Sequence, residues 1–480
     1  MYSFLLHHAP ALLIGLPVFF SLMIVITCSE ILGSRLMITA NILMLLYSLF
    51  ILIFSKDDID YIFGGYEKKV GIEFMLGHFE SLLLTLQYTL ASIFSMSYAS
   101  TFKSQVEPIL KEDRRFIPYA LFLIVNAGFS GIILTNDAFN LYVFLEIVTI
   151  SSYPLLAISN EKKAINYTFD YLIIGTVASS LILVFVGFLL ILTGSLNLSI
   201  IKEANLAQNE HLQLILPLLF VGILIKLAIF PFHSWKIQSY SSTSATNSIF
   251  FLSLGNIIII ALFHKFHFLY SSSSTIHQVY LILCISALVC SILGYFTEKF
   301  IDLLIYSSIS SFSSFLLLWP YGAKFGYGTN LSVALELLII DSVTKMGLAH
   351  LTLIAKTNNL NIRDVKYIFS NHRYLNYSLI FLLLNAASLP PTIMFYAKIE
   401  LIEKIFKMHS IYLPFILVSS CFTILTFMNI LKIIITAEPT SKNDQNVTEH
   451  IKSYAGMLVP TAILLLLLIF SNILYKEFLV

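Results

Sequence analysis

The sequence predicts an all-α integral membrane protein with about 14 transmembrane helices. Its 480 residues are 58% hydrophobic and only 11% charged, with a mean hydropathy of +0.87, whereas soluble domains are about 25% charged. Apolar runs of about 20 residues, long enough to cross ~30 Å of hydrocarbon, recur along the whole chain. These runs are too long and too evenly apolar for barrel strands, so the spanning elements are expected to be helices.

The first apolar run, near Pro10 to Thr27, has no basic leader and no small-residue cleavage site. It is therefore expected to be a first span and not a cleaved signal. The polar stretches between the runs are only loop-sized, so no soluble domain is expected. The predicted spans cover about 9–29, 36–55, 78–98, 116–135, 139–158, 168–194, 213–238, 246–268, 275–296, 302–320, 329–356, 376–408, 411–436 and 455–475.

Loop charges predict the orientation of these spans. With the N-terminus outside, the cytoplasmic loops collect most of the lysines and arginines, among them Lys103, Lys111 and Arg115. The excess of basic residues on the inner side of a membrane then places both termini on the outer face. The expected location is a bacterial inner (plasma) membrane, with the lipid bilayer as the surrounding phase.

Four ionisable residues lie inside predicted spans, namely Glu146, Lys226, Lys345 and Lys398. A charge at mid-membrane costs ~2.5–3.5 kcal/mol on insertion scales, so each one calls for a reason. They either pair or snorkel for structural reasons, or they carry protons. Glu146 and Lys226 have apolar residues on every side and lie too deep to snorkel easily.

Prolines lie beside two of these lysines. Pro231 follows Lys226 by five residues, and Pro390–Pro391 precede Lys398. A proline inside a span breaks the helix, and broken helices at membrane depth usually line a polar cavity. The breaks fall in spans seven and twelve, a separation that predicts two related five-helix units. The predicted segments are 1–115, 116–268 (first unit), 269–436 (second unit) and 437–480.

The buried charges suit proton transfer. A lysine removed from water gives up its proton more readily, and a nearby carboxylate favours its charged form. Asp341 and Lys345 lie one helical turn apart, so they can form a second pair, either as a structural bridge or as a proton carrier. His233 could join a relay or cap the broken helix. His350, Glu336 and Asp170 are secondary candidates, expected to be mainly structural.

Other kinds of site are not indicated. The net charge of +1 suggests no nucleic-acid partner, and there is no HExxH, GxSxG, GxGxxG or Walker A pattern. No metal or cofactor site is therefore expected. The cysteines show no CxxC spacing and are interpreted as small core residues, at Cys28, Cys284, Cys290 and Cys421.

Three segments resemble the antiporter-like family shared by Mrp-type (Mnh) multisubunit cation/proton antiporters and the proton-pumping arm of respiratory complex I. They are NDAFNLYVFLEI with SSYPLLA, IKLAIFPFHSW, and SLPPTIMFYAK, and LIYSSISSFS is similar as well. The stretch GGYEKKVGIEF followed by ESLLL is similar to the D subunit of the Mrp antiporters in particular. The resemblance spans nearly the whole chain.

The resemblance implies fourteen helices, two inverted five-helix repeats and a central polar axis. In that scheme Glu146 matches the essential glutamate, Lys226 its lysine partner on the broken helix, Lys345 the lysine of the eleventh span and Lys398 the terminal lysine. The implied partners are other hydrophobic antiporter subunits, and the implied cargo is protons and a monovalent cation such as Na⁺.

The chain departs from the family pattern in the middle of this axis. The family's bridging lysine of the eighth span aligns with Asn256 or Ile257, and the next lysine is Lys265 near the helix end. Two family histidines align with Ser311 and Asp341, and the WLPDAH-like segment reads WKIQSY. Water or Asn256 could bridge the altered middle, or the chain could be a divergent member with weakened transport.

Three functions therefore remain open. The first is a proton-translocating subunit of a cation/proton antiporter that uses Glu146, Lys226, Lys345 and Lys398. The second is a proton-pumping subunit of an NADH:quinone oxidoreductase or a related redox complex, with every redox centre in partner subunits. The third is a divergent, non-transporting scaffold.

Overall fold

The computed structural model describes eleven ranges of the chain, and all statements below concern them. They are residues 2–55, 58–69, 71–105, 109–159, 162–204, 209–270, 276–318, 327–354, 360–365, 373–436 and 458–465. Helices dominate these ranges, as predicted. The predicted span at 455–475 lies mostly outside them.

The chain divides by its contacts into two compact units. The first contains Met1–Ala99, Val106–Leu227 and Ile257–Ile276, and the second contains Ser100–Gln105, Ala228–Asn256 and His277–Val480. The boundary therefore falls next to Lys226 and again inside one helix. This division differs from the four predicted segments, whose repeat boundaries stay a prediction.

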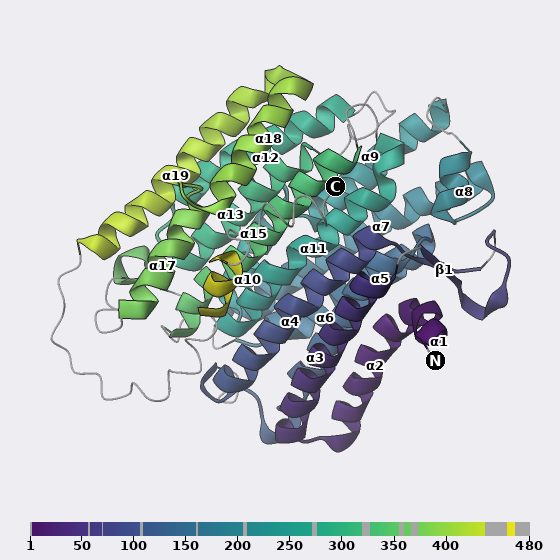
Figure 1. Cartoon of the computed structure of the whole chain (residues 1–480), viewed down its shortest axis with the longest axis horizontal. Helices are drawn as coiled ribbons and strands as arrows, with labels where there is room; N and C mark the ends of the chain where they lie inside the picture. Colours follow the sequence, from purple (N-terminus) through teal and green to yellow (C-terminus); the bar gives the residue numbers. More distant parts are fainter. Residues whose placement is uncertain are drawn as a thin grey trace. The chain divides into compact units, whose positions relative to one another are not determined.

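The first unit is built mainly of long helices. α2 packs on α3 and α5, α5 on α6, α6 on α7, and α7 on α9, and Figure 1 shows α2, α3 and α5 side by side. The elements are α1 (Tyr2–His7), α2 (Ala9–Thr27), α3 (Glu30–Phe54), α4 (His78–Gln105), α5 (Ile117–Leu134), α6 (Ala138–Ala157), α7 (Lys163–Thr193), α8 (Leu198–Glu203) and α9 (Glu210–Lys226), with a short 3-10 turn η2 (Glu112–Arg114). The second half of α11 (Ala245–Tyr270) also belongs to this unit.

A small β-hairpin is the exception to the all-α prediction. β1 (Ile59–Ile62) pairs antiparallel with β2 (Glu73–Leu76), with Ile59 opposite Leu76, in a polar stretch that the sequence predicts to be only a loop. A 3-10 turn, η1 (Phe63–Gly65), follows β1. Phe74 also bridges to Thr135 at the end of α5, which fixes the hairpin at one end of the unit. We call this end the hairpin side of the first unit.

Glu73 anchors the hairpin with a fully buried side chain. Its carboxylate accepts hydrogen bonds from Asn136 (2.8 Å) and Asn197 (2.6 Å) and pairs with Lys68 at 2.8 Å. Burial acts to raise the pKa of Glu73, but the hydrogen bonds from Lys68, Asn197 and Asn136 outweigh it, so the pKa is lowered from its ordinary 4.5. The charged form is therefore the one that holds the hairpin in place.

The hairpin is expected to loosen in acid. Since the folded-state pKa of Glu73 lies below its unfolded value, its stabilisation is complete above pH 4.5 and is lost as the pH falls through the lowered pKa. Limited proteolysis of the purified protein should show the hairpin becoming sensitive below pH 4.5. Glu73→Gln should lose about 2 kcal/mol of local stability and this acid response together; an unchanged acid response in Glu73→Gln would contradict the assignment.

Close packing of α5 on α6 depends on glycines. A Cβ on Gly131 would collide with the ring of Phe144, and one on Gly128 would lie 2.5 Å from Val148. Such positions are far inside van der Waals contact, so α6 can approach α5 only because the two glycines lack side chains. This approach helps to set the position of Glu146 on α6.

Gly131→Ala is therefore expected to destabilise the protein by about 1–3 kcal/mol, because the added methyl group forces the two helices apart. Thermal unfolding in detergent measures the change. Gly187→Ala is the matched control, since Gly187 on α7 has no atom within 4 Å of an added Cβ. Equal unfolding midpoints for the two variants would show that α5 and α6 do not need a glycine at this crossing.

The second unit is also helical, and α15 lies at its centre. α15 packs on α13, α17 and α18, while α19 packs on α17 and α18. The elements are α10 (Ser234–Ser242), the first half of α11, α12 (Ile276–Phe296), α13 (Phe300–Leu316), α15 (Tyr327–Ile354), η4 (Ile362–Asp364), α17 (Arg373–Ala386), α18 (Ile393–His409), η5 (Ser410–Tyr412) and α19 (Leu413–Ile435).

Both predicted helix breaks are confirmed. The seventh predicted span separates into α9 and α10, with Ala228 at a positive φ of 55° and Pro231 in the break. The twelfth separates into α17 and α18, with Ser388 at φ 54° and Pro390–Pro391 in the break. In each break the residue with positive φ stands three positions before the last proline. Asn385 ties the second break together, since its amide donates to Thr344 (2.7 Å) and its carbonyl accepts from the backbone of Met394.

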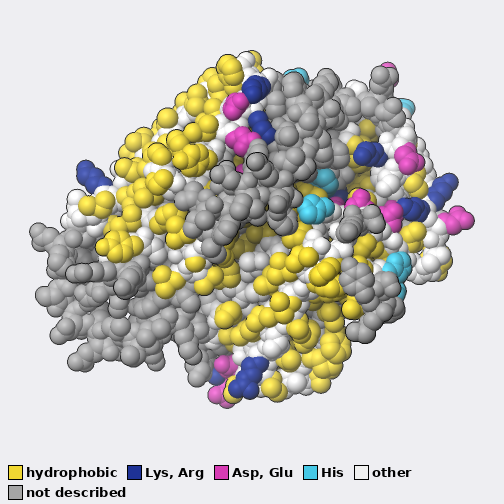
Figure 2. All heavy atoms as spheres, viewed as in Figure 1, with side chains coloured by type: hydrophobic (Ala, Val, Ile, Leu, Met, Phe, Trp, Pro, Cys, Tyr) yellow, Lys and Arg dark blue, Asp and Glu magenta, His cyan; other side chains and the backbone are white. Residues whose placement is uncertain are grey.

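Within the described ranges, nine helices are long and apolar enough to cross a membrane. Many of the side chains that face outward from them are large and apolar, as lipid contact requires. Figure 2 shows such side chains over α19 and over α2 and α3. The protein is thus a multi-pass membrane protein, while the full count of about 14 spans stays a prediction.

Candidate functional site

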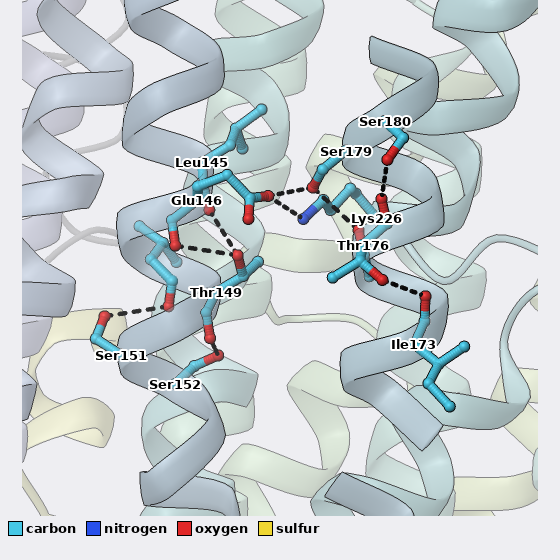
Figure 3. A network of polar contacts seen from close by, with 12 residues as sticks. Leu145, Glu146, Thr149, Ser151, Ser152, Ile173, Thr176, Ser179, Ser180 and Lys226 are labelled. Carbon is cyan, nitrogen blue, oxygen red and sulfur yellow. Dashed lines mark hydrogen bonds and ion pairs between the residues drawn. The ribbon is translucent and has the colours of Figure 1, made fainter. Parts of the chain in front are cut away.

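Glu146 and Lys226 form an ion pair inside the first unit. Glu146 lies in the middle of α6, and Lys226 is the last residue of α9, with Nζ 3.5 Å from Oε1 of Glu146. The hydroxyl of Ser179 on α7 donates to the same oxygen (Figure 3). Three helices therefore converge on one carboxylate, and the pairing expected from the sequence is present.

This pair is loose. A separation of 3.5 Å exceeds an ordinary N–H···O hydrogen bond, and the Lys226 ammonium, whose side chain is 7% exposed, has no hydrogen-bond partner in the described structure. Glu146 is 21% exposed. The two groups are thus held near each other without being locked, so either one can change its protonation state and partner.

The helix break explains why Lys226 stands where it does. α9 ends at Lys226 because the chain reaches Leu227 and then the proline-containing break. The last carbonyls of a helix carry a partial negative charge, which favours a cation in the last turn. A continuous helix would lack this local stabilisation of a buried ammonium.

Asp341 and Lys345 form a second pair, in the second unit. Both side chains are buried on α15, with Nζ 3.8 Å from Oδ1. Lys345 also donates to the hydroxyl of Ser307 on α13 and lies 5.2 Å from the ring centre of Phe427 on α19. The predicted pairing one turn apart is therefore present, and its environment is more polar than the sequence alone indicates.

Two further lysines interact electrostatically with Asp341. Lys398 on α18 is buried and interacts electrostatically with Asp341 and Lys345. Lys236 on α10 is also buried, lies 5.7 Å from the ring centre of Tyr240, and has Asp341 as its electrostatic partner. The hydroxyl of Ser311 lies beside the same carboxylate. Asp341 is thus the shared anion of a three-lysine cluster, which we call the Asp341 cluster (Lys236, Asp341, Lys345, Lys398).

Lys236 is the member of this cluster that the sequence does not predict. It lies within a predicted span, in the segment WKIQSY, which stands out in the sequence only as a departure from the family pattern. A lysine inside a predicted span is the same signal that singles out Lys226. Because the residues next to Lys236 in the sequence are polar, this lysine does not stand out as a charge inside an apolar run.

The remaining predicted relay residues have mixed outcomes. Asn256 is buried, donates to the Ser308 hydroxyl at 3.3 Å, and has no hydrogen-bond partner for its Oδ1. His233 is the N-cap residue of α10, and its backbone carbonyl accepts from Lys236, but its side chain makes no capping hydrogen bond. Its Nδ1 has no hydrogen-bond partner. His350 bonds through Nδ1 to the Met346 carbonyl, and five residues of helix turn it about 140° away from Lys345. Asn256, His233 and His350 each have a buried polar atom with no hydrogen-bond partner in the described structure, so all three stay relay candidates.

In the part of the chain that the structure describes, no group of three or more His, Cys, Asp or Glu residues is placed to hold a metal ion.

Comparison with known proteins gives consistent matches. The family described as "NADH:quinone oxidoreductase/Mrp antiporter, TM" matches residues 135–423. The D subunit of the Na(+)/H(+) antiporter of Bacillus subtilis (strain 168) is 27% identical over 412 residues, which cover 84% of this chain and 80% of that protein. The N subunit of the NADH-quinone oxidoreductase of Desulforudis audaxviator is 36% identical over 187 residues, covering 38% of this chain and 36% of that protein.

A solved structure shares the fold. A chain in the structure of the Mrp complex from Dietzia sp. DQ12-45-1b aligns with a TM-score of 0.84 at 18% identity, covering 98% of this chain and 95% of that chain. The predicted fold class of a helical membrane protein is thus confirmed.

Proposed function

This chain belongs to the NADH:quinone oxidoreductase/Mrp antiporter transmembrane family, and on that premise we propose that it is the proton-translocating membrane subunit of a multisubunit monovalent cation/proton antiporter. Its cargo is protons, its partners are other hydrophobic antiporter subunits, and Na⁺ is the cation that they exchange. It lies in a bacterial inner (plasma) membrane, with both termini on the outer face.

The observation that carries this proposal is the buried, loosely held pair of Glu146 and Lys226 beside a helix break. A pair needed only for stability would be expected to close to hydrogen-bonding distance and to satisfy the ammonium fully. A pair that must open and close in every transport cycle is easier to break and re-form when the two groups are not fully hydrogen-bonded.

In the first unit, Glu146 accepts a proton and becomes neutral. Lys226 then loses the anion that favours its charged form and releases its own proton more readily. When Glu146 gives up its proton, the attraction returns and Lys226 is charged again. One proton on the carboxylate thus controls the proton on the amine, while Ser179 keeps Oε1 oriented.

In the second unit, Asp341 plays the corresponding part for three lysines. Each proton that arrives or leaves on Lys236, Lys345 or Lys398 changes how strongly the other two are held by the one carboxylate. Ser307 and Ser311 supply hydroxyl groups that can both donate and accept. The Asp341 cluster is therefore suited to passing a proton between lysines.

The test is the identity of the stoichiometric partners of the tagged chain, purified from native membranes and analysed by mass spectrometry. Small hydrophobic antiporter subunits are the expected result, and the purified complex should then move protons in response to a cation gradient. The chain itself is a transport subunit and not an enzyme.

A second candidate is supported by the 36% identity to a subunit of an NADH-quinone oxidoreductase. In that case the chain is a proton-pumping subunit of a redox complex. Flavin and iron–sulfur proteins would then co-purify, and the same buried residues would carry protons. A scaffold without transport, suggested by the altered residues Asn256 and Ser311, is contradicted if Glu146→Ala abolishes a cation-driven pH change while the protein still inserts normally.

A further inference from the structure

The first unit contains another buried carboxylate–lysine pair. Glu80 stands in the first turn of α4, and Lys265 stands in the second half of α11, with Nζ 3.4 Å from Oε1. The two side chains are only 3% and 5% exposed, so this pair is more buried than Glu146 and Lys226. Neither residue has a part in the proton path described above.

A glycine connects buried Glu80 to an exposed residue, Asp58. Oε2 of Glu80 accepts the backbone N–H of Gly77 at 3.2 Å. A Cβ on Gly77 would lie 3.0 Å from this oxygen and 2.8 Å from Oδ1 of Asp58, which is exposed. The two carboxylates thus border the same glycine, and no side chain at position 77 separates them.

Ring contacts relate this pair to Glu146. On α7, Phe185 contacts Phe266, the neighbour of Lys265 on α11, with ring centres 6.3 Å apart. Phe185 stands six residues beyond Ser179, the partner of Glu146, which is ~9 Å along the helix axis. Measured along the axis of α7, Lys265 therefore lies about two helical turns beyond the position of Glu146.

A second contact shows that the hairpin side lies in the direction from Glu146 to Glu80. Phe144 on α6, two residues before Glu146, contacts Phe74 of β2 with ring centres 6.3 Å apart. β2 leads directly into α4, where Glu80 lies. Glu80 and Lys265 thus lie between Glu146 and the hairpin side of the first unit.

We propose that Glu80 and Lys265 form a proton-transfer pair that connects the Glu146–Lys226 pair to the surface at Asp58, on the hairpin side of the first unit. The proposal rests on the proposed function, since it extends the same proton path. The predicted orientation places this end on the outer face of the membrane.

The proton moves through this pair in three steps. The neutral amine of Lys265 takes a proton that water molecules between the two pairs pass on from the Glu146–Lys226 pair, and it becomes an ammonium. The ammonium passes a proton to the Glu80 carboxylate, which leaves a neutral amine and a carboxylic acid. Glu80 then releases the proton to water beside Asp58 and is a carboxylate again. All steps run equally in reverse, so the pair serves uptake as well as release.

Stability alone is a poor reason for such a pair. Removal of both charges from a buried pair is often neutral or stabilising, whereas removal of one partner is strongly destabilising. A variant that removes both charges together should therefore fold, and it separates a transport role from a structural one.

The experiment uses the complete complex in proteoliposomes, with an imposed Na⁺ gradient and a pH-sensitive dye inside. The double variant Glu80→Gln with Lys265→Met is expected to assemble and unfold like the wild type. Its rate of proton transport should fall at least about 10-fold. Glu80→Asp with Lys265→Arg should retain most of the transport. Glu403→Gln with Lys407→Met is the matched control, because this pair on α18 has the same charges and is exposed.

Wild-type transport in the doubly neutral variant would overturn the proposal. Should that variant fail to assemble, Gly77→Ala replaces it. The added methyl group would crowd both carboxylates and should slow transport about 10-fold, while Gly187→Ala should have no effect. Wild-type transport in Gly77→Ala would then overturn the proposal.

The controls separate this proposal from the proposed function. A wild-type complex that moves no protons in any cation gradient contradicts the proposed function. A wild-type complex that is active, with Glu146→Gln inactive and the Glu80/Lys265 double variant fully active, contradicts only the proton-transfer role of Glu80 and Lys265.

Discussion

Glu146→Gln is expected to reduce cation-driven proton transport about 10²-fold or more, because a positioned acid–base group typically contributes a factor of this size. The glutamine can still accept the hydrogen bond from Ser179, but it can neither bind nor release a proton. Proton movement in proteoliposomes that contain the purified complex measures the effect.

Two controls show whether the loss is chemical. Glu146→Asp keeps the carboxylate and should restore part of the activity. Glu146→Gln combined with Lys226→Met avoids an unpaired buried ammonium, so it should be as stable as the wild type and equally inactive. Normal transport in Glu146→Gln would remove Glu146 from the proton path.

The principal pair was predictable because the membrane makes buried charges expensive. Glu146 and Lys226 each stand alone in a long apolar run, where an unpaired charge would cost several kcal/mol. The prolines gave a second, independent signal, because a proline in mid-span removes a backbone bond and breaks the helix. Both breaks follow from the prolines and are confirmed. The pairing of Glu146 with Lys226 is what the family resemblance implies, and it is present, whereas the proton-carrying roles of the residues stay a prediction.

The Glu80–Lys265 pair could not be predicted in the same way. Each residue stands near the end of a span, where charged side chains ordinarily reach water by snorkelling. Their burial results from how the start of α4 packs near the second half of α11. That packing depends on contacts between residues 185 positions apart in the sequence.

The β-hairpin was missed for a related reason. Its strands are only four residues long, and one of them includes Asp60 and the other Glu73, so the segment reads as a polar loop. The hydrogen bonds of Asn136 and Asn197 to Glu73 hold β2 in place. Those partners come from distant parts of the chain and give no local signal.

Lys236→Met is expected to reduce transport about 10²-fold, because it removes one of the cations around Asp341. Methionine fills a similar volume without a charge, so the variant should fold and assemble. Lys432→Met is the control, since Lys432 on α19 is exposed. Transport at the wild-type rate in Lys236→Met would exclude Lys236 from the path.

A lysine moved from position 236 to position 256 tests whether Lys236 takes the place of the family's bridging lysine. The resemblance puts a bridging lysine at Asn256 or Ile257, yet Asn256 here donates to Ser308, the neighbour of the serine that binds Lys345. The positions that depart from the family pattern also interact with one another. Ser311 lies beside Asp341, and Asp341 attracts Lys236. If Lys236 supplies the bridging cation from α10, then Lys236→Met combined with Asn256→Lys should recover much of the lost transport, because the charge returns at the family's position. No recovery in a stably assembled double variant would mean that Lys236 acts on Asp341 from its own site and is not a substitute for the bridging lysine.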